Sequence, residues 1–162
     1  MPRLLVVHHV PTPSVQRLAE AVVAGTRDDA ITGVEVVVRP ALSTSAQDVL
    51  DADGYLLGTP ANFGYMSGAL KHFFDSTFQR AGGALGEDGS AAPAGPGRRP
   101  YGLWVHGRYD TTGAVRSVES IVGALPWVRS APVLEVLGEV TDEHLEAAYD
   151  LGGTIAALLS PA

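Results

Sequence analysis

Residues 54–74 read GYLLGTPANFGYMSGALKHFF, and within this stretch the pattern changes from that of a strand to that of a helix. The apolar run at 55–57 is followed by Gly58, Thr59 and Pro60, and the proline predicts the end of the strand because it has no N–H to give to a sheet. Beyond Ser67, apolar side chains recur at the spacing of one helix face, at Leu70, Phe73, Phe74, Thr77, Phe78 and Ala81. Residues 60–66 are therefore predicted to form a loop at the carboxyl end of a strand.

The rest of the chain repeats the same alternation. Strands are predicted at 3–9, 34–38, 101–105 and 131–140, and helices at 15–26, about 47–51, 68–81, 115–125 and 141–159. Strand and helix alternate five times, which predicts an α/β fold of three layers, with a parallel sheet between two layers of helices. The two loops best suited to a cofactor follow the first and third strands, so we expect a five-stranded sheet of order 2-1-3-4-5, whose switch point lies between those strands.

The loop at 60–66 has the composition of a site for a flat ring. Ligands of open parallel sheets bind outside the carboxyl ends of the strands. Phe63, Tyr65 and Met66 offer flat or polarizable apolar surface, and Asn62 both donates and accepts hydrogen bonds. The alternative interpretation is a plain strand, turn and amphipathic helix with no ligand.

The segment GTPANFGYMSGALKHFFD, residues 58–75, resembles the flavin loop of the flavodoxin-like NAD(P)H-dependent FMN reductases and quinone reductases. In that family a strand ending in Gly-(Ser/Thr)-Pro runs into Phe-Gly-x-Met-(Ser/Ala)-Gly and then into a helix. The resemblance covers most of the chain and implies the flavodoxin-like fold, FMN as cofactor and NADH or NADPH as electron donor. It assigns the flavin ring to Pro60, Ala61, Asn62, Phe63, Gly64, Tyr65 and Met66.

The loop after the first predicted strand, residues 9–16, reads HVPTPSVQ. Thr12 fits a helix N-cap with Pro13 at the first helical position, where its missing N–H costs little. The backbone amides of the next three residues are then expected to point outward from a helix N-terminus, an arrangement that binds phosphate. The FMN phosphate is accordingly assigned to Thr12, Ser14, Val15 and Gln16.

The same loop departs from the family pattern, which has Ser or Thr directly after the strand and Gly in the turn. Val10 and Pro11 occupy the early positions and Pro13 stands in place of the glycine, so two amides and one hydroxyl are missing. The alternative interpretation of this loop is an ordinary Thr-Pro helix start.

The loop after the fourth predicted strand, residues 106–113, is expected to lie beside residues 60–66. In the resembled family this segment wraps the pyrimidine edge of the isoalloxazine, which places His106 and the amide of Gly107 at the N1/O2 region of the ring. A donor there would stabilise the reduced, anionic flavin. The alternative is a strand-end histidine that only hydrogen-bonds backbone.

Composition and motifs exclude several other functions. The net charge is −7 and no basic tract is longer than Arg98-Arg99, so nucleic acid is not an expected partner. The chain has no cysteine, so redox chemistry has to come from a bound cofactor. His8 and His9 point to opposite faces of a strand, which argues against a metal site. Residues 64–68 lack the spacing of a nucleophile elbow, and no nucleotide-binding glycine motif is present.

The length of 162 residues fits a single domain spanning 1–162, in which the Gly/Ala/Pro-rich segment at about 82–99 is predicted to be a mobile surface loop. The apolar run before Pro11 is too short for a signal sequence, and no segment has the length of a membrane span, which predicts a cytoplasmic protein. The resembled reductases are often dimers or tetramers, so the resemblance implies a homodimer or homotetramer.

The function predicted from the sequence is an FMN-dependent oxidoreductase that moves electrons from NADH or NADPH to a quinone, flavin or similar acceptor. Its chemistry belongs to the flavin, so no side chain is assigned a catalytic role. Two alternatives remain open. One is an FMN electron carrier that does not itself oxidise a nicotinamide, and the acidic net charge favours it. The other is a flavodoxin-fold binding module that has lost FMN, which the substitutions in the loop at 10–13 suggest.

Overall fold

The structure is a computed structural model that describes residues 1–81 and 98–161. Its strands are β1 (Arg3–His8), β2 (Glu35–Pro40), β3 (Gly54–Asn62), β4 (Tyr65–Met66), β5 (Arg99–Gly107), β6 (Trp127–Arg129) and β7 (Leu134–Leu137). Its helices are α1 (Pro13–Thr26), α2 (Ala46–Asp51), α3 (Gly68–Thr77), α4 (Thr112–Val122) and α5 (Asp142–Leu159), with a 3-10 turn, η1 (Ala41–Ser43). The alternation of strands and helices predicted from the sequence is confirmed.

The main sheet is parallel and has the order β2-β1-β3-β5, followed by β6 and β7 at the far edge. Its order therefore follows the predicted 2-1-3-4-5 pattern, but the fifth strand is in two pieces. β6 pairs with Arg99–Tyr101 and β7 pairs with Trp104–Gly107. The break between them contains Pro132, whose missing N–H cannot join a ladder. The prediction of one strand at 131–140 was wrong in this respect.

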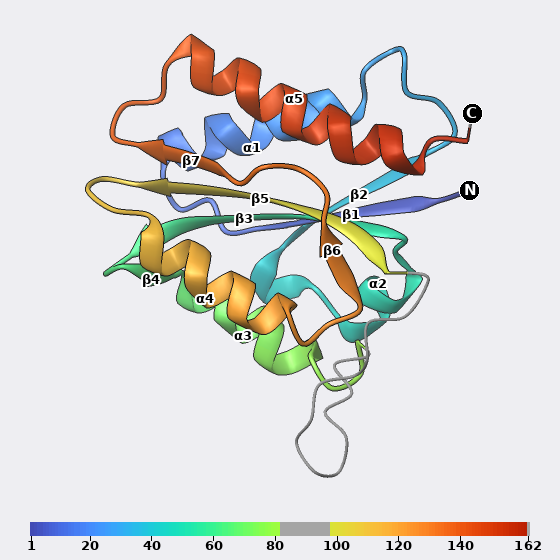
Figure 1. Ribbon diagram of the computed structural model, residues 1–162, viewed down its shortest axis with the longest axis horizontal. Helices are drawn as coiled ribbons and strands as arrows, with labels where there is room; N and C mark the ends of the chain where they lie inside the picture. The colour runs from blue at the N-terminus through green and yellow to red at the C-terminus, as the bar shows by residue number, and fades with distance from the viewer. Residues whose placement is uncertain (82–97, 162) are drawn as a thin grey trace.

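Helices cover both faces of the sheet (Figure 1). α1 and α5 pack on one face, where their side chains meet Leu4, Val6, Leu56 and Trp104. α3 and α4 pack on the other face, against Leu5, Val7, Leu57, Leu103 and Val105. Successive residues of the central strands are thus buried on opposite faces, as the continuous apolar runs of these strands require.

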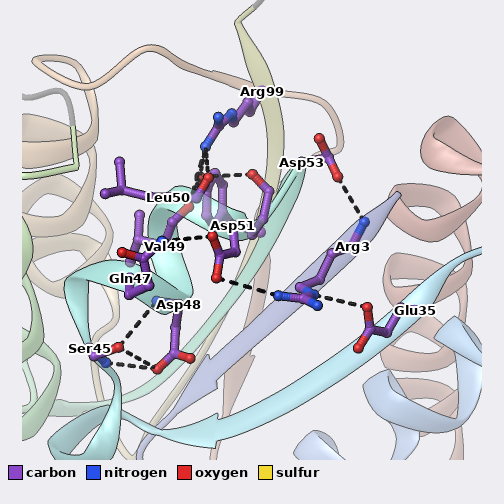
Figure 2. Close-up of polar contacts among 12 residues, drawn as sticks. Arg3, Glu35, Ser45, Gln47, Asp48, Val49, Leu50, Asp51, Asp53 and Arg99 are labelled. Carbon is purple, nitrogen blue, oxygen red and sulfur yellow. Dashed lines mark hydrogen bonds and ion pairs between the residues drawn. The ribbon is translucent and has the colours of Figure 1, made fainter. Parts of the chain in front are cut away.

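Two arginines form hydrogen bonds at the amino-terminal ends of the strands (Figure 2). The Arg3 guanidinium donates to Glu35 at 2.9 Å, and its backbone amide donates to Asp53 at 2.8 Å. The Arg99 guanidinium donates to the Tyr55 hydroxyl at 2.8 Å and to the carbonyls of Val49 and Leu50 at the end of α2. These contacts tie strands and helix together at the edge opposite the loops that follow β1, β3 and β5.

The predictions about the segment at 82–99, the single domain and membrane spans are tested only in part by the structure. The segment at 82–99 lies outside the described residues except for Arg98 and Arg99, and the single-domain organisation stays a prediction. Among the helices of residues 1–81 and 98–161, none combines the length and the apolarity that crossing a bilayer requires.

Candidate functional site

The segment predicted as a loop at 60–66 is a tight β-hairpin. β3 continues through Pro60 to Asn62, and β4 returns antiparallel to it. The two turn residues, Phe63 and Gly64, have φ of 51° and 74°, the left-handed values that a two-residue hairpin of this type needs at both positions. The prediction that Pro60 ends the strand was wrong, because the residue stays in parallel register with His106. A phenylalanine with positive φ is uncommon and marks the turn as a constrained feature.

The hairpin has an anchored base and an exposed tip. The Met66 side chain is buried in the core, and its amide donates to the Ser117 hydroxyl at 3.2 Å. The Ser67 amide donates to the Thr59 hydroxyl at 2.9 Å. The tip carries Phe63, whose side chain is fully exposed. Met66 therefore supports the hairpin from below and does not offer its thioether to a ligand, in contrast to the prediction.

The loop that follows β5 is held by its own hydrogen bonds. The Thr111 hydroxyl donates to Glu135 of β7 at 2.8 Å, and the Thr112 amide donates to the Asp110 carboxylate at 3.0 Å. The hydrogen bond from the Thr112 backbone lowers the pKa of Asp110, which keeps this carboxylate ionised as an acceptor. Between these anchors, Tyr109 projects with 86% of its surface exposed. Sequence reasoning missed Tyr109, although an aromatic residue in a loop at a strand's carboxyl end was a usable signal.

The hairpin and the loop after β5 touch each other, as the sequence predicted. A Cβ added to Gly113, in the first turn of α4, would lie 1.9 Å from the Gly64 carbonyl oxygen. A Cβ added to Gly107 would lie 3.2 Å from the Cβ of Ala61. Only glycine at position 113 permits so close an approach of two backbones. The contact brings two loops that each carry an exposed aromatic side chain, Phe63 and Tyr109, to the same edge of the sheet.

His106 is committed to a backbone contact. Its Nε2 lies 2.7 Å from the Gly138 carbonyl oxygen, which can only accept, so Nε2 carries the proton. The alternative interpretation of a strand-end histidine that hydrogen-bonds backbone therefore describes this nitrogen. In the neutral ring Nδ1 is then an acceptor, not the donor that the sequence reasoning placed at a flavin edge. Gly107 is buried, and its carbonyl accepts from the Gly138 amide at 2.8 Å.

The start of α1 has the predicted cap. Thr12 is the N-cap with Pro13 in the first turn, and the Thr12 hydroxyl accepts from the Val15 amide at 3.4 Å. The Gln16 amide donates to the Thr12 carbonyl at 3.0 Å and so closes the first helical turn. In contrast to the prediction, this amide does not point outward. The His9 amide donates to the Gly58 carbonyl at 3.1 Å, which holds the preceding loop beside β3.

Comparisons with known proteins point to one fold. No protein-family model matches the chain. Over 94 residues it is 34% identical to a flavodoxin of Aquifex aeolicus, a match that covers 58% of this chain and 49% of the relative. Over 97 residues it is 32% identical to an NAD(P)H dehydrogenase (quinone) of Acidithiobacillus ferrooxidans, covering 48% of each. The chain thus spans about half the length of these curated relatives.

The solved structures agree over nearly the whole chain. A flavodoxin from the domain Archaea superposes with a TM-score of 0.77 at 18% identity, covering 97% of this chain and 98% of that one. This agreement concerns the fold, because the identity is low. The chain has the flavodoxin-like fold, and in sequence it resembles flavodoxin and the flavodoxin-like NAD(P)H quinone reductases.

Proposed function

We propose that the protein is an FMN-dependent oxidoreductase that accepts electrons from NADH or NADPH and passes them to a quinone, a flavin or a similar small acceptor. The observation that carries the proposal is the pair of exposed aromatic side chains, Phe63 and Tyr109, on two contacting loops at the carboxyl edge of the sheet. Phe63 follows β3, which borders the switch point, and Tyr109 follows the next strand, β5, at the end of the sheet where ligands of this fold class bind. The names of the curated relatives support an oxidoreductase.

The chemistry of the two loops fits a flat, polar-edged ring. Exposed aromatic side chains lose apolar contact with water when a ring stacks on them. Asn62 is exposed beside Phe63 and can both donate and accept at the edge of the ring. Pro60, Ala61, Gly64 and Tyr65 complete the hairpin, with Met66 as its buried support. On the other side, the Gly107 amide would lie at the pyrimidine edge, where the acceptor Nδ1 of His106 could accept only from a ring N–H.

The phosphate would lie at the N-terminus of α1, a 14-residue helix whose dipole favours an anion. Thr12 and Ser14 supply hydroxyls, and the amide of Ser14 is a donor in the first turn. The amides of Val15 and Gln16 are already engaged by Thr12, so they shape this site rather than bind directly. The cradle is therefore sparse, and most of the binding free energy would come from the ring.

When bound, FMN would supply the hydride and electron chemistry, because no side chain of the site is suited to it. The chain's own residues would hold the ring between the hairpin and the loop after β5. We place the protein in the cytoplasm and expect a homodimer or homotetramer. Sedimentation that shows only monomer at micromolar concentration would contradict the oligomer.

Phe63→Ala is expected to weaken FMN binding at least about tenfold, because loss of ring stacking and apolar contact is worth about 1.4 kcal/mol or more. The matched control is Leu158→Ala, which removes an exposed apolar side chain near the end of α5. Fluorescence titration of FMN into each flavin-free variant measures its dissociation constant for FMN. Equal affinities for the two variants would rule out the hairpin tip as the ring site.

A carrier without nicotinamide chemistry is the second candidate, favoured by the match to a flavodoxin and by the net charge of −7. Anaerobic mixing of the FMN-loaded protein with NADPH, and separately with NADH, distinguishes the two. A reductase loses its flavin absorbance with the nicotinamide alone and regains it when a soluble quinone is added. A carrier is reduced only when a separate reductase is present, and that result would overturn the enzyme proposal.

A further inference from the structure

A cavity of about 420 Å³ lies along α1, between that helix and the edge of the sheet at β1 and β2. Its apolar wall is formed by Val10 of the loop after β1, Ala19 and Val23 of α1, and Val38 of β2. None of the hairpin residues 60–66 or of the residues 106–113 lines it. The cavity is therefore separate from the proposed ring site, although Gln16, at the proposed phosphate site, also lines it. Its size falls in the range of small-molecule sites.

The cavity carries a polar group that lacks a partner. His8, at the end of β1, lines it, and the buried Nδ1 of His8 receives no hydrogen bond from any of the described residues. Burial lowers the pKa of His8, so the imidazole is neutral at neutral pH. An unpaired buried polar atom costs free energy. Because Nδ1 is buried, the His8 ring would have to turn about its Cβ–Cγ bond before Nδ1 could meet a ligand in the cavity.

One acidic and one basic side chain line the same cavity at different positions along α1. Glu20 and Arg27 both line it from α1, and about 10 Å of helix axis separates them. In the part of the chain that the structure describes, neither side chain forms an ion pair. Arg27 is the C-cap residue of α1, where the helix dipole also favours its positive charge but leaves its guanidinium able to bind an anion.

We propose that this cavity binds a compact aromatic carboxylate of one or two rings. The ring would lie on the apolar wall near Val23 and Val38, the carboxylate would meet the Arg27 guanidinium, and His8 would hydrogen-bond the opposite side of the ligand. Glu20 would oppose the negative charge and thereby limit affinity. This site does not depend on FMN.

The probe is 2-naphthoate, titrated calorimetrically at neutral pH into the full chain without flavin. Saturable binding of one molecule per chain is expected. Arg27→Gln should weaken it at least about fivefold through loss of the charge-assisted hydrogen bonds, whereas Arg17→Gln, which changes an exposed arginine of the same helix outside the cavity, should change it less than about twofold. Glu20→Gln should strengthen binding, because it removes like-charge repulsion.

A cavity-filling variant provides a test that does not depend on charge. Ala24 is exposed and lines the cavity, so Ala24→Leu should weaken 2-naphthoate binding at least about tenfold without disturbing the core. Ala157→Leu on the exposed side of α5 is the matched control and should leave binding unchanged. Nitrogen-15 NMR of the His8 ring should show a shift when the probe is added. Absence of saturable binding, equal affinity in Ala24→Leu, or displacement of the probe by FMN would overturn the proposal.

Discussion

Gly152→Ala is expected to lower the free energy of unfolding by about 3 kcal/mol or more, or to prevent folding, because α1 and α5 cross with their backbones in contact. A Cβ at position 152 would lie 2.0 Å from the Val22 carbonyl oxygen. The reciprocal contact is as tight, since a Cβ at Gly25 would lie 1.9 Å from the Tyr149 carbonyl oxygen. Neither carbonyl belongs to a flexible side chain, so the two helices would have to separate and open the core beneath them.

The next residue of α5 provides the matched control. A Cβ at Gly153 would lie 3.4 Å from the nearest atom, the Gly25 carbonyl oxygen, which is ordinary contact. Gly153→Ala should therefore leave stability unchanged or raise it by up to about 1 kcal/mol through helix propensity. Urea unfolding of both variants measures the difference. If Gly152→Ala were as stable as Gly153→Ala, the close packing of α1 on α5 would be refuted.

Gly113→Ala is expected to weaken FMN binding at least about tenfold while costing less stability than Gly152→Ala. The added Cβ would lie 1.9 Å from the Gly64 carbonyl oxygen, so the hairpin turn would be pushed away from α4. Gly64 lies in an exposed turn that can move, whereas the carbonyls at the α1–α5 crossing cannot. The strain would thus appear as a changed spacing between Phe63 and Tyr109, which a ring held between two loops cannot tolerate.

The control for this variant is Gly68→Ala at the start of α3. It lies two residues beyond β4, yet a Cβ there meets nothing within 4 Å. The Gly68→Ala variant should bind FMN with the same affinity as the unaltered protein. FMN titration of Gly113→Ala and Gly68→Ala gives their affinities for FMN, and urea unfolding gives their free energies of unfolding. Wild-type affinity in a folded Gly113→Ala would show that the spacing of the two loops does not determine binding.

The periodicity of apolar residues in the sequence predicted the layered fold, because the layers are held together by the burial of those residues. The runs Leu4–Val7, Tyr55–Leu57 and Leu103–Val105 are buried on both faces, and the pattern of such runs identifies central parallel strands. The errors arose at prolines. Pro60 was predicted to end a strand. The strand instead continues to Asn62, and Pro60 remains paired in parallel register with His106. Pro132, within the predicted fifth strand, marks the break between β6 and β7.

The site was predictable as a set of loops but not as a geometry. The sequence placed residues 60–66 and 106–113 side by side, and the contact of Gly113 with Gly64 confirms this. It could not show that Met66 faces the core or that His106 is bound to the Gly138 carbonyl, because these depend on residues distant in sequence. The separate cavity beside His8 likewise arises only when α1 lies against β2.

The most direct test of the account is a titration of FMN into the flavin-free protein, followed by the fluorescence of the flavin. We predict saturable quenching with one FMN bound per chain, because the hairpin and the loop after β5 together present two aromatic faces to the ring. Absence of saturable quenching in a folded protein would contradict the account. It would mean that Val10, Pro11 and Pro13 have removed too much of the phosphate site, and a binding module without flavin would then be the better description.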